Sequence, residues 1–517
     1  MRAHSLFTCL ALLLTSAQLD GQTPARRDTS IDGQTYGLIS ATQLLDALRQ
    51  TPPDILLEYR DAVFDGPIFA PTADLDTVQA SLIFANVIFL DEVSFNRIVF
   101  NRETRFENAQ FRGGLSALGA QFAGDLTLSQ STSRKHTSFK QTVFAGIADF
   151  SKSQFKQTTS FIEAQFSSAD FSNAHFAADT YFERATFGGK ADFRDAFFAG
   201  IAALKQTRWH GAATFAGARF QQRTRFWQAH FAAAVDFDNA RTRDEISFKQ
   251  TIFSGPATFR HITFVHPARF TRAVFHQSVS FADSRFKKTA DFTGARFAAD
   301  LDLNAYFKSA LDLRYSRGPS LDLLPPFGER SAVNPDSTFT DTARIYLQRA
   351  NFDHILFRWV QLTGRLASLD STGQDLGPVY DRLRHHLASE GYVADARACF
   401  AASMDHRLQY LDWSQVEWHG LQFLRLSTDY GTNIGRLGLF ASACILIFAL
   451  LYRVCGWSPG AGKSVANCLY FSLLTFLRIA PPAWPDGPPI TRLLIAAQTL
   501  LGWLSFALFL FTLLAAF

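Results

Sequence analysis

Large apolar residues recur along residues 84–307 on two interleaved ladders, each with an eleven-residue period. Phe150 and Phe161 belong to the first ladder, and Phe155 and Phe166 follow five residues behind on the second. The ladder slips once by one residue, so that Phe171 follows Phe161. A small or β-branched residue usually stands two positions before each Phe, and the residues between are polar or Gly. Because side chains at i and i−2 of an extended chain face the same way, the pattern predicts strands with one large and one small inward residue.

Four inward positions, separated by five or six residues, make one square coil of about 22 residues that stacks on the next at about 4.8 Å. Residues 84–307 then form about ten coils of a β-solenoid. A helix does not fit, because two inward positions in eleven residues leave too little apolar surface per turn. The clearest members of the inward ladder are Phe150, Phe171, Phe182, Phe193, Phe215, Phe226, Phe259, Phe270, Phe281 and Phe292.

The run from Ala169 to Phe176, with Ala two residues before each Phe, resembles pentapeptide-repeat proteins. The resemblance implies a right-handed quadrilateral β-helix, which we place at residues 76–318. Some members of that family mimic DNA and shield DNA gyrase, but they are strongly acidic and cytosolic. The repeat region here holds more Lys and Arg than Asp and Glu, so we expect no such role and no nucleic-acid partner.

The N-terminus has the features of an export signal. Arg2 precedes a short apolar run from Leu6 to Leu14, and Thr15 and Ala17 are small residues suited to cleavage. We predict a signal peptide over residues 1–21, with an uncleaved anchor as the alternative. Residues 22–75 form a leader and cap, in which a helix beginning after Ser40 covers the edge groups of the first coil.

Beyond the repeats, a segment rich in Pro and Gly, Gly318–Pro335, predicts the end of the rod. Residues 336–430 read as a helical linker. Apolar residues from Ile345 to Leu362 recur at helical spacing, Pro378 starts a further helix, and Ala394–Arg407 forms the next. The Trp residues of Asp412–Leu426 favour an interfacial helix at headgroup depth.

Residues 431–517 contain two apolar stretches, about 435–456 and 493–517, that are long enough to span a bilayer. The segment between them, about 464–479, is too short to cross alone. Leu469–Phe476 resembles the pore helix of two-span potassium channels, which implies a re-entrant helix and a homo-oligomer, a tetramer if it forms a pore. The pore-helix and filter-like positions are Tyr470, Ser472, Thr475, Leu477, Arg478, Ile479 and Ala480.

The filter sequence departs from that resemblance, because Leu477–Pro482 holds no glycine and Arg478 repels cations. We therefore expect a degenerate pore that is not potassium-selective. An exported rod places the loop 453–492 in the cytoplasm, and its four basic residues against Asp486 agree with the positive-inside rule. The predicted location is a bacterial-type inner membrane, crossed more than once, with the β-helix extracytoplasmic. This orientation is similar to that of ionotropic glutamate receptors.

Composition changes this picture little. Phe accounts for 53 of 517 residues, which suits a Phe-based repeat, and the net charge is only +4. Five Cys residues are too few for a disulfide framework. His residues are scattered without ligand spacing, and neither a complete phosphate loop nor a nucleophile motif is present, so we expect no metal, no cofactor and no enzyme.

Two functions remain open. The first is a degenerate, ion-channel-like pore in an oligomer. The second is a non-conducting membrane scaffold whose β-helix binds a surface protein or polysaccharide. Both have the lipid bilayer as a partner.

Overall fold

A computed structural model describes residues 27–31, 33–53, 55–70, 75–324, 338–369, 373–455, 464–479 and 489–514. The chain divides into two compact units, Met1–Val279 and Ser280–Phe517, which we describe one at a time. The predicted signal peptide and Ala480 lie outside the described residues.

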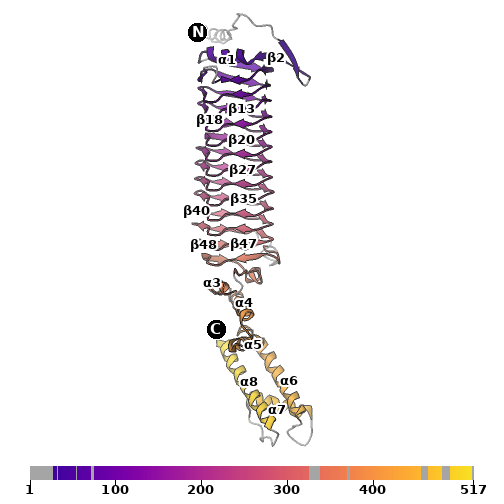
Figure 1. The fold of residues 1–517 in the computed structure, drawn as a ribbon. Coiled ribbons are helices and arrows are strands. Elements are labelled where there is room, and N and C mark those ends of the chain that lie inside the picture. The colour runs from indigo at the N-terminus through magenta and orange to yellow at the C-terminus, as the bar shows by residue number, and fades with distance from the viewer. Residues whose placement is uncertain are drawn as a thin grey trace, which may run out of the picture. The chain divides into compact units, whose positions relative to one another are not determined.

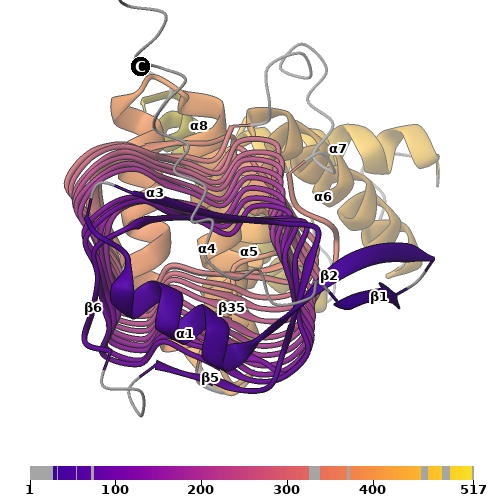
Figure 2. The ribbon, with the colours of Figure 1, turned by 90° about the horizontal axis from the view of Figure 1, so that it is seen from above.

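The first unit is a stack of coils, which confirms the predicted β-solenoid (Figure 1). Strands of one coil pair in parallel with strands of the next at an offset of 22 residues, as in Arg208 with His230 and Ala213 with Val235. Figure 2 shows that each coil has four sides. Counted along the whole chain, the coil recurs about 13 times, more often than the ten repeats predicted from the Phe ladder.

The strands of the first unit form three sheets, because two neighbouring sides of the coil share one sheet. The first sheet consists of β1 (Arg27–Ile31), β2 (Gln34–Ser40), β4 (Ala62–Asp65), β8 (Ile88–Phe89), β12 (Gln110–Phe111), β16 (Thr132–Ser133), β19 (Gln154–Phe155), β22 (His175–Phe176), β26 (Phe197–Phe198), β30 (Arg219–Phe220), β34 (Arg241–Thr242) and β38 (Thr263–Phe264). The single-sided second sheet consists of β5 (Ile68–Phe69), β9 (Val93–Ser94), β13 (Leu115–Ser116), β17 (Thr137–Ser138), β20 (Thr159–Ser160), β23 (Thr180–Tyr181), β27 (Ala202–Ala203), β31 (Thr224–Arg225), β35 (Ile246–Ser247) and β39 (Ala268–Arg269).

The two-sided third sheet is held together by long strands that turn the corner between its sides, such as β18 (Val143–Asp149) and β21 (Gln165–Asp170). Its other strands are β3 (Leu56–Arg60), β6 (Thr77–Val78), β7 (Ser81–Ala85), β10 (Val99–Phe100), β11 (Thr104–Glu107), β14 (Gln121–Phe122), β15 (Leu126–Thr127), β24 (Thr186–Phe187), β25 (Ala191–Asp192), β28 (Arg208–Trp209), β29 (Ala213–Thr214), β32 (His230–Phe231), β33 (Val235–Asp236), β36 (Ile252–Phe253), β37 (Ala257–Thr258) and β40 (Val274–Phe275). Strand β41 (Val279–Ser280) stands at the boundary of the two units.

The Phe ladder fills the inside of the coils. Phe215 is fully buried, and its ring lies 4.8 Å from that of Phe193 and 4.7 Å from that of Phe237, nearly parallel to both. The small residues two positions earlier, such as Ala213, are buried beside them. The predicted inward residues are all buried: Phe150, Phe171, Phe182, Phe193, Phe215, Phe226, Phe259, Phe270, Phe281 and Phe292.

The one-residue slip in the sequence is a bulge in β18. Phe144 pairs with Phe166, but the next pair is Ile147 with Ser168, so β18 holds one residue more than β21. The exposed side chain of Ile147 marks where the extra length lies outside the coil. Pairing is restored at Ala148 and Ala169, so the inward ladder continues undisturbed.

Helix α1 (Ala41–Gln50) lies across the open side of the first coils and packs on β5 and β6 (Figure 2). Ser40 is its N-cap and forms a capping box with Gln43. Leu44 and Leu48 are buried, so the apolar side of the helix covers the inside of the coil.

A tight turn recurs every eleven residues and has a left-handed second residue. Lys152, Gln206 and Asn239 have φ values of 57°, 58° and 60°. Such values are uncommon for residues other than glycine. The turn closes with a backbone hydrogen bond three residues apart, as from the Ser153 amide to the Phe150 carbonyl.

The second unit begins with the same kind of strand. These strands are β42 (Arg285–Phe286), β43 (Ala290–Asp291), β44 (Arg296–Phe297), β45 (Leu301–Asp302), β46 (Tyr306–Phe307), β47 (Ala310–Asp312), β48 (Arg317–Asp322), β49 (Arg344–Tyr346) and β50 (Asn351–Leu356). Leu311 pairs with Ile345, an offset of 34 residues instead of 22, so twelve residues are inserted into this coil.

Two expectations are therefore wrong. Gly318 does not end the solenoid, because it lies in β48 and pairs with Phe352. The apolar residues that follow are not helical until α2 (Trp359–Leu362). Ile345, Phe352 and Trp359 are seven residues apart, which fits one helix face, but Ile345 and Phe352 are inward residues of strands. The insertion hid the eleven-residue period at this point.

The remaining linker is helical, as predicted. The 3-10 turn η3 (Gln374–Leu376) leads into α3 (Gly377–Ser389), which has Pro378 in its first turn and buries Leu383 and Leu387. Helix α4 (Val393–Tyr410) packs against α3. Helix α5 (Val416–Thr428) follows and contacts α4 and the first apolar helix.

Candidate functional site

Three apolar helices end the second unit and pack against one another (Figure 1). Helix α6 (Ile434–Val454) and helix α8 (Pro489–Leu514) are long and apolar enough to cross a membrane. Helix α7 (Val465–Leu477) has only 13 residues and contacts both. Since Ser472 contacts Ile445 near the middle of α6 and Gln498 near the middle of α8, α7 reaches the central part of the helix pair.

One buried amide joins all three helices. The Gln498 side chain of α8 donates to the Ser472 hydroxyl of α7 over 2.6 Å and to the Ser472 carbonyl over 3.0 Å. Its oxygen accepts from the Tyr452 hydroxyl of α6 over 2.7 Å. The Ser472 hydroxyl in turn donates to the Ile445 carbonyl over 2.7 Å. Because an unpaired buried polar group is costly, this network fixes the register of the three helices.

A close backbone contact lies one turn further along α8. A Cβ atom added to Gly502 would stand 2.2 Å from the Phe476 carbonyl oxygen of α7. No real side chain tolerates this distance, so glycine is what allows α7 and α8 to approach so closely.

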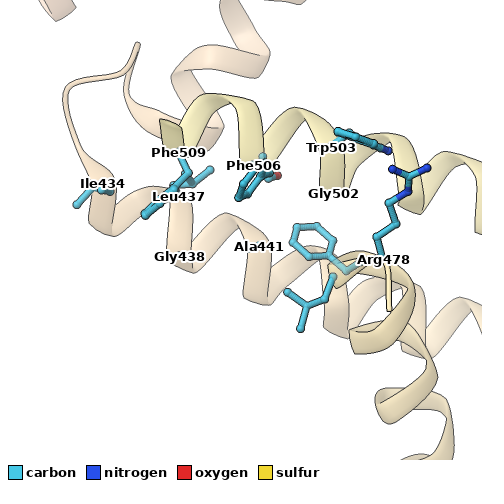
Figure 3. Close-up of a pocket in the computed structure, with 12 residues that line it drawn as sticks. Ile434, Leu437, Gly438, Ala441, Arg478, Gly502, Trp503, Phe506 and Phe509 are labelled. Carbon is cyan, nitrogen blue, oxygen red and sulfur yellow. The ribbon is translucent and has the colours of Figure 1, made fainter. Parts of the chain in front are cut away.

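The end of α7 differs from the filter of a potassium channel. Arg478 adopts a left-handed conformation with φ 60°, and the Ile479 amide donates to the Leu474 carbonyl over 2.9 Å. This is a Schellman cap with Arg where Gly is usual. The Arg478 guanidinium lies over the Trp503 ring, 4.2 Å from its centroid, as Figure 3 shows. The cation is thus held by α8 of its own chain.

A cavity of about 480 Å³ lies beside this contact, between α6, the end of α7 and α8 (Figure 3). Leu437, Phe506 and Phe509 give it an apolar wall, and Arg478 is the only charged residue that lines it. The arrangement offers space for an apolar chain and no ring of oxygen ligands for an ion.

The predicted filter-like residues divide into two groups. Ser472 and Thr475 are buried within the helix unit, whereas Tyr470, Leu477 and Ile479 are exposed. The structure brings Ser472 to Gln498 and Tyr452, and it does not bring Ser472 and Tyr470 to one surface. Reasoning from the sequence missed the roles of Tyr452 and Trp503. The signal that was available is Gln498, the polar residue that stands out in its apolar run.

Metal and thiol chemistry find no support in the part of the chain that the structure describes. No group of three or more His, Cys, Asp and Glu residues there could hold a metal ion. Burial raises the pKa of the Cys399 thiol in α4 to about 12, so this thiol is protonated at neutral pH. Burial also lowers the pKa of His386 in α3.

The comparisons with known proteins concern the solenoid. The family model of pentapeptide repeats (9 copies) matches residues 84–132, 139–186, 182–230, 226–274 and 266–305. No curated protein and no solved structure matches the chain.

Proposed function

Because this is a pentapeptide-repeat protein with two helices long enough to span a membrane, we propose that it is a membrane-anchored scaffold. In this proposal α6 and α8 cross the bilayer, and the β-solenoid presents its outer faces to a partner. Catalysis plays no part in it.

One observation carries the choice of an anchor over a pore. The hydroxyl groups of Ser472 and Thr475 in α7 are turned into the helix unit, and the exposed residues of α7 are apolar or aromatic: Val465, Leu469, Tyr470, Leu473 and Leu477. An ion path needs carbonyl or charged groups along it, whereas lipid requires an apolar surface with the polar groups satisfied inside. The exposed side of α7 meets the second requirement.

Membrane integration and orientation can be measured on the full chain. We expect the protein to stay in the membrane fraction after alkaline carbonate extraction. In intact cells, an impermeant maleimide should label Lys152→Cys on the solenoid and leave Ser464→Cys before α7 unlabelled, relative to the unsubstituted chain. Both positions are exposed. Release by carbonate would refute the anchor, and the reverse labelling pattern would refute the extracytoplasmic rod.

A pore is the second candidate, and the length and position of α7 favour it. Helix α7 is too short to cross a bilayer and ends at Leu477, beside Gly502 in the middle of α8. This is how a re-entrant helix is arranged. In a tetramer, four copies of Arg478 near the axis would repel cations, since unit charges 4 Å apart interact by about 4 kcal/mol at an effective dielectric near 20.

Planar bilayers separate the two candidates. The anchor predicts no conductance from the wild type or from Arg478→Gln, with both proteins folded and inserted. The pore predicts a cation current that appears or grows in Arg478→Gln and not in the control Arg492→Gln, at the start of α8. Any conductance of this kind would overturn the anchor as the sole function.

A further inference from the structure

One side of the solenoid carries two straight rows of outward side chains. It is the side formed by the strands from β12 to β34, and we call it the basic face. Its inward residues, such as Phe155 and Phe176, are each flanked by one outward residue before and one after. Because successive strands pair in register, these flanking residues stack in rows along the coils.

The first row contains Gln110, Thr132, Gln154, His175, Phe197, Arg219 and Arg241. The second row contains Arg112, Arg134, Lys156, Ala177, Ala199, Gln221 and Arg243.

The two rows hold cations and no carboxylate. Six of their residues are Arg or Lys, and the nearest acidic residues along the chain, such as Asp179 and Asp244, stand at the corners. Within the described residues, Arg134 and Arg241 form no ion pair. The positive charge reaches His175, whose pKa is lowered first by burial and then by Lys156.

Other sides of the same unit neutralise their cations. Arg194 pairs with Asp192 over 2.6 Å. Arg184 pairs with Glu163 over 2.5 Å, and Arg260 with Asp238 over 2.6 Å. The contrast shows that the positive charge of the basic face does not follow from the repeat itself.

A shallow hollow of about 500 Å³ lies on the basic face. Its lining alternates neutral hydrogen-bonding groups with cations: Gln110, Thr132 and Gln154 come from the first row, and Arg134 and Lys156 from the second. The Lys156 ammonium donates to the Gln154 side-chain oxygen over 2.6 Å, so the two rows touch. Neighbouring cations in a row are one coil apart, about 4.8 Å.

A ligand that matches these rows is linear, with an anionic group and hydroxyl groups in each repeating unit. Carboxylates suit Arg and Lys, and hydroxyl groups suit the amides and the threonine. Beyond the hollow, the His175 and Phe197 rings lie 4.7 Å apart and give a flat apolar step against which a sugar ring can pack. A single-stranded nucleic acid gains its affinity from bases stacked on aromatic platforms, and no aromatic residue lines the hollow.

We propose that the basic face binds an acidic polysaccharide that runs along the stack of coils, across Arg134 and Lys156. This inference deepens the scaffold function and rests on it, because it names the partner that the anchored solenoid would hold.

The test uses the full chain in detergent and immobilised polygalacturonate, a polymer of uronic acid, at 0.15 M salt. We expect saturable binding that weakens as salt rises. The double substitution Arg134→Gln with Lys156→Gln should weaken binding by about tenfold, the loss expected from two exposed charge contacts. The matched control, Lys140→Gln with Lys152→Gln, removes two exposed charges at the turns and should change binding by less than about twofold.

Three results would overturn the inference. They are equal losses in the two double variants, equal binding of the neutral polymer dextran, and tighter binding of single-stranded DNA than of polygalacturonate. Failure of the scaffold function is recognised separately, because it appears in the carbonate extraction and leaves binding to the immobilised polymer unchanged.

Discussion

The solenoid and the three apolar helices deal with buried polar groups in opposite ways. In the coils, inward hydroxyl groups donate to a backbone carbonyl of the preceding coil, as Thr142 does to Ala117 and Thr251 to Phe226, both over 2.7 Å. In the helix unit, one side chain, Gln498, satisfies partners on two other helices. The rod spreads its stability over many equivalent bonds, whereas the helix unit depends on a few specific residues.

The largest effect is expected from a charge placed inside the rod. Phe215→Asp removes a buried ring, which costs about 3–5 kcal/mol, and adds a carboxylate without a partner. We expect a total loss above about 5 kcal/mol, enough to melt the surrounding coils. Far-UV circular dichroism of the full chain during denaturant titration measures it.

The control for this experiment is Ala212→Asp, an exposed position in the same coil. It should leave the denaturation midpoint nearly unchanged. Equal losses at residues 212 and 215 would contradict the inward register of the Phe ladder.

A smaller but more localised effect is expected in the helix unit. Gln498→Leu fills a similar volume but leaves the Tyr452 hydroxyl without its acceptor, at a cost of about 1–3 kcal/mol. Helix α7 should loosen, so the buried thiol of Cys468 should react faster with N-ethylmaleimide. Ser442→Ala on the exposed side of α6 breaks a bond only within its own helix and serves as the control. Unchanged labelling in the Leu variant would show that the amide does not hold α7.

The smallest effect is expected at the turns, and it should be stabilising. Lys152 is exposed and left-handed, a conformation that costs a side chain about 1–2 kcal/mol. Because glycine also loses more backbone entropy on folding, Lys152→Gly should gain at most about 1 kcal/mol. Thermal unfolding of the full chain reports the gain. Lys140→Gly, at a turn position without positive φ, should destabilise instead, and a gain at both positions would rule out this explanation.

The regular part of the fold was predictable because each coil repeats the same inward pattern. Phe150, Phe171 and Phe193 signal both the strand and its register, and the bulge was visible as a slip in spacing. The pattern failed where twelve residues interrupt a coil, since Ile345 and Phe352 then match a helix as well as a strand. A local pattern does not reveal pairing at a distance of 34 residues.

The candidate site was predictable only in part, because its residues come from three helices. Arg478 was identified from its place after α7, and Gln498 stood out as polar in an apolar run. Nothing in the sequence indicated that Trp503 would take the Arg478 side chain or that Gly502 would touch Phe476. These contacts depend on how α7 and α8 are positioned against each other.

The bulge at Ile147 bears on how such a rod changes over generations. The extra residue of β18 lies outside, and pairing is regained at Ala148, within the same strand. A deletion or insertion of one codon at this kind of corner therefore leaves the rest of the ladder in register. Blocks of coils can be duplicated and joined at imperfect seams, provided that each seam falls on an outer corner and not on an inward residue.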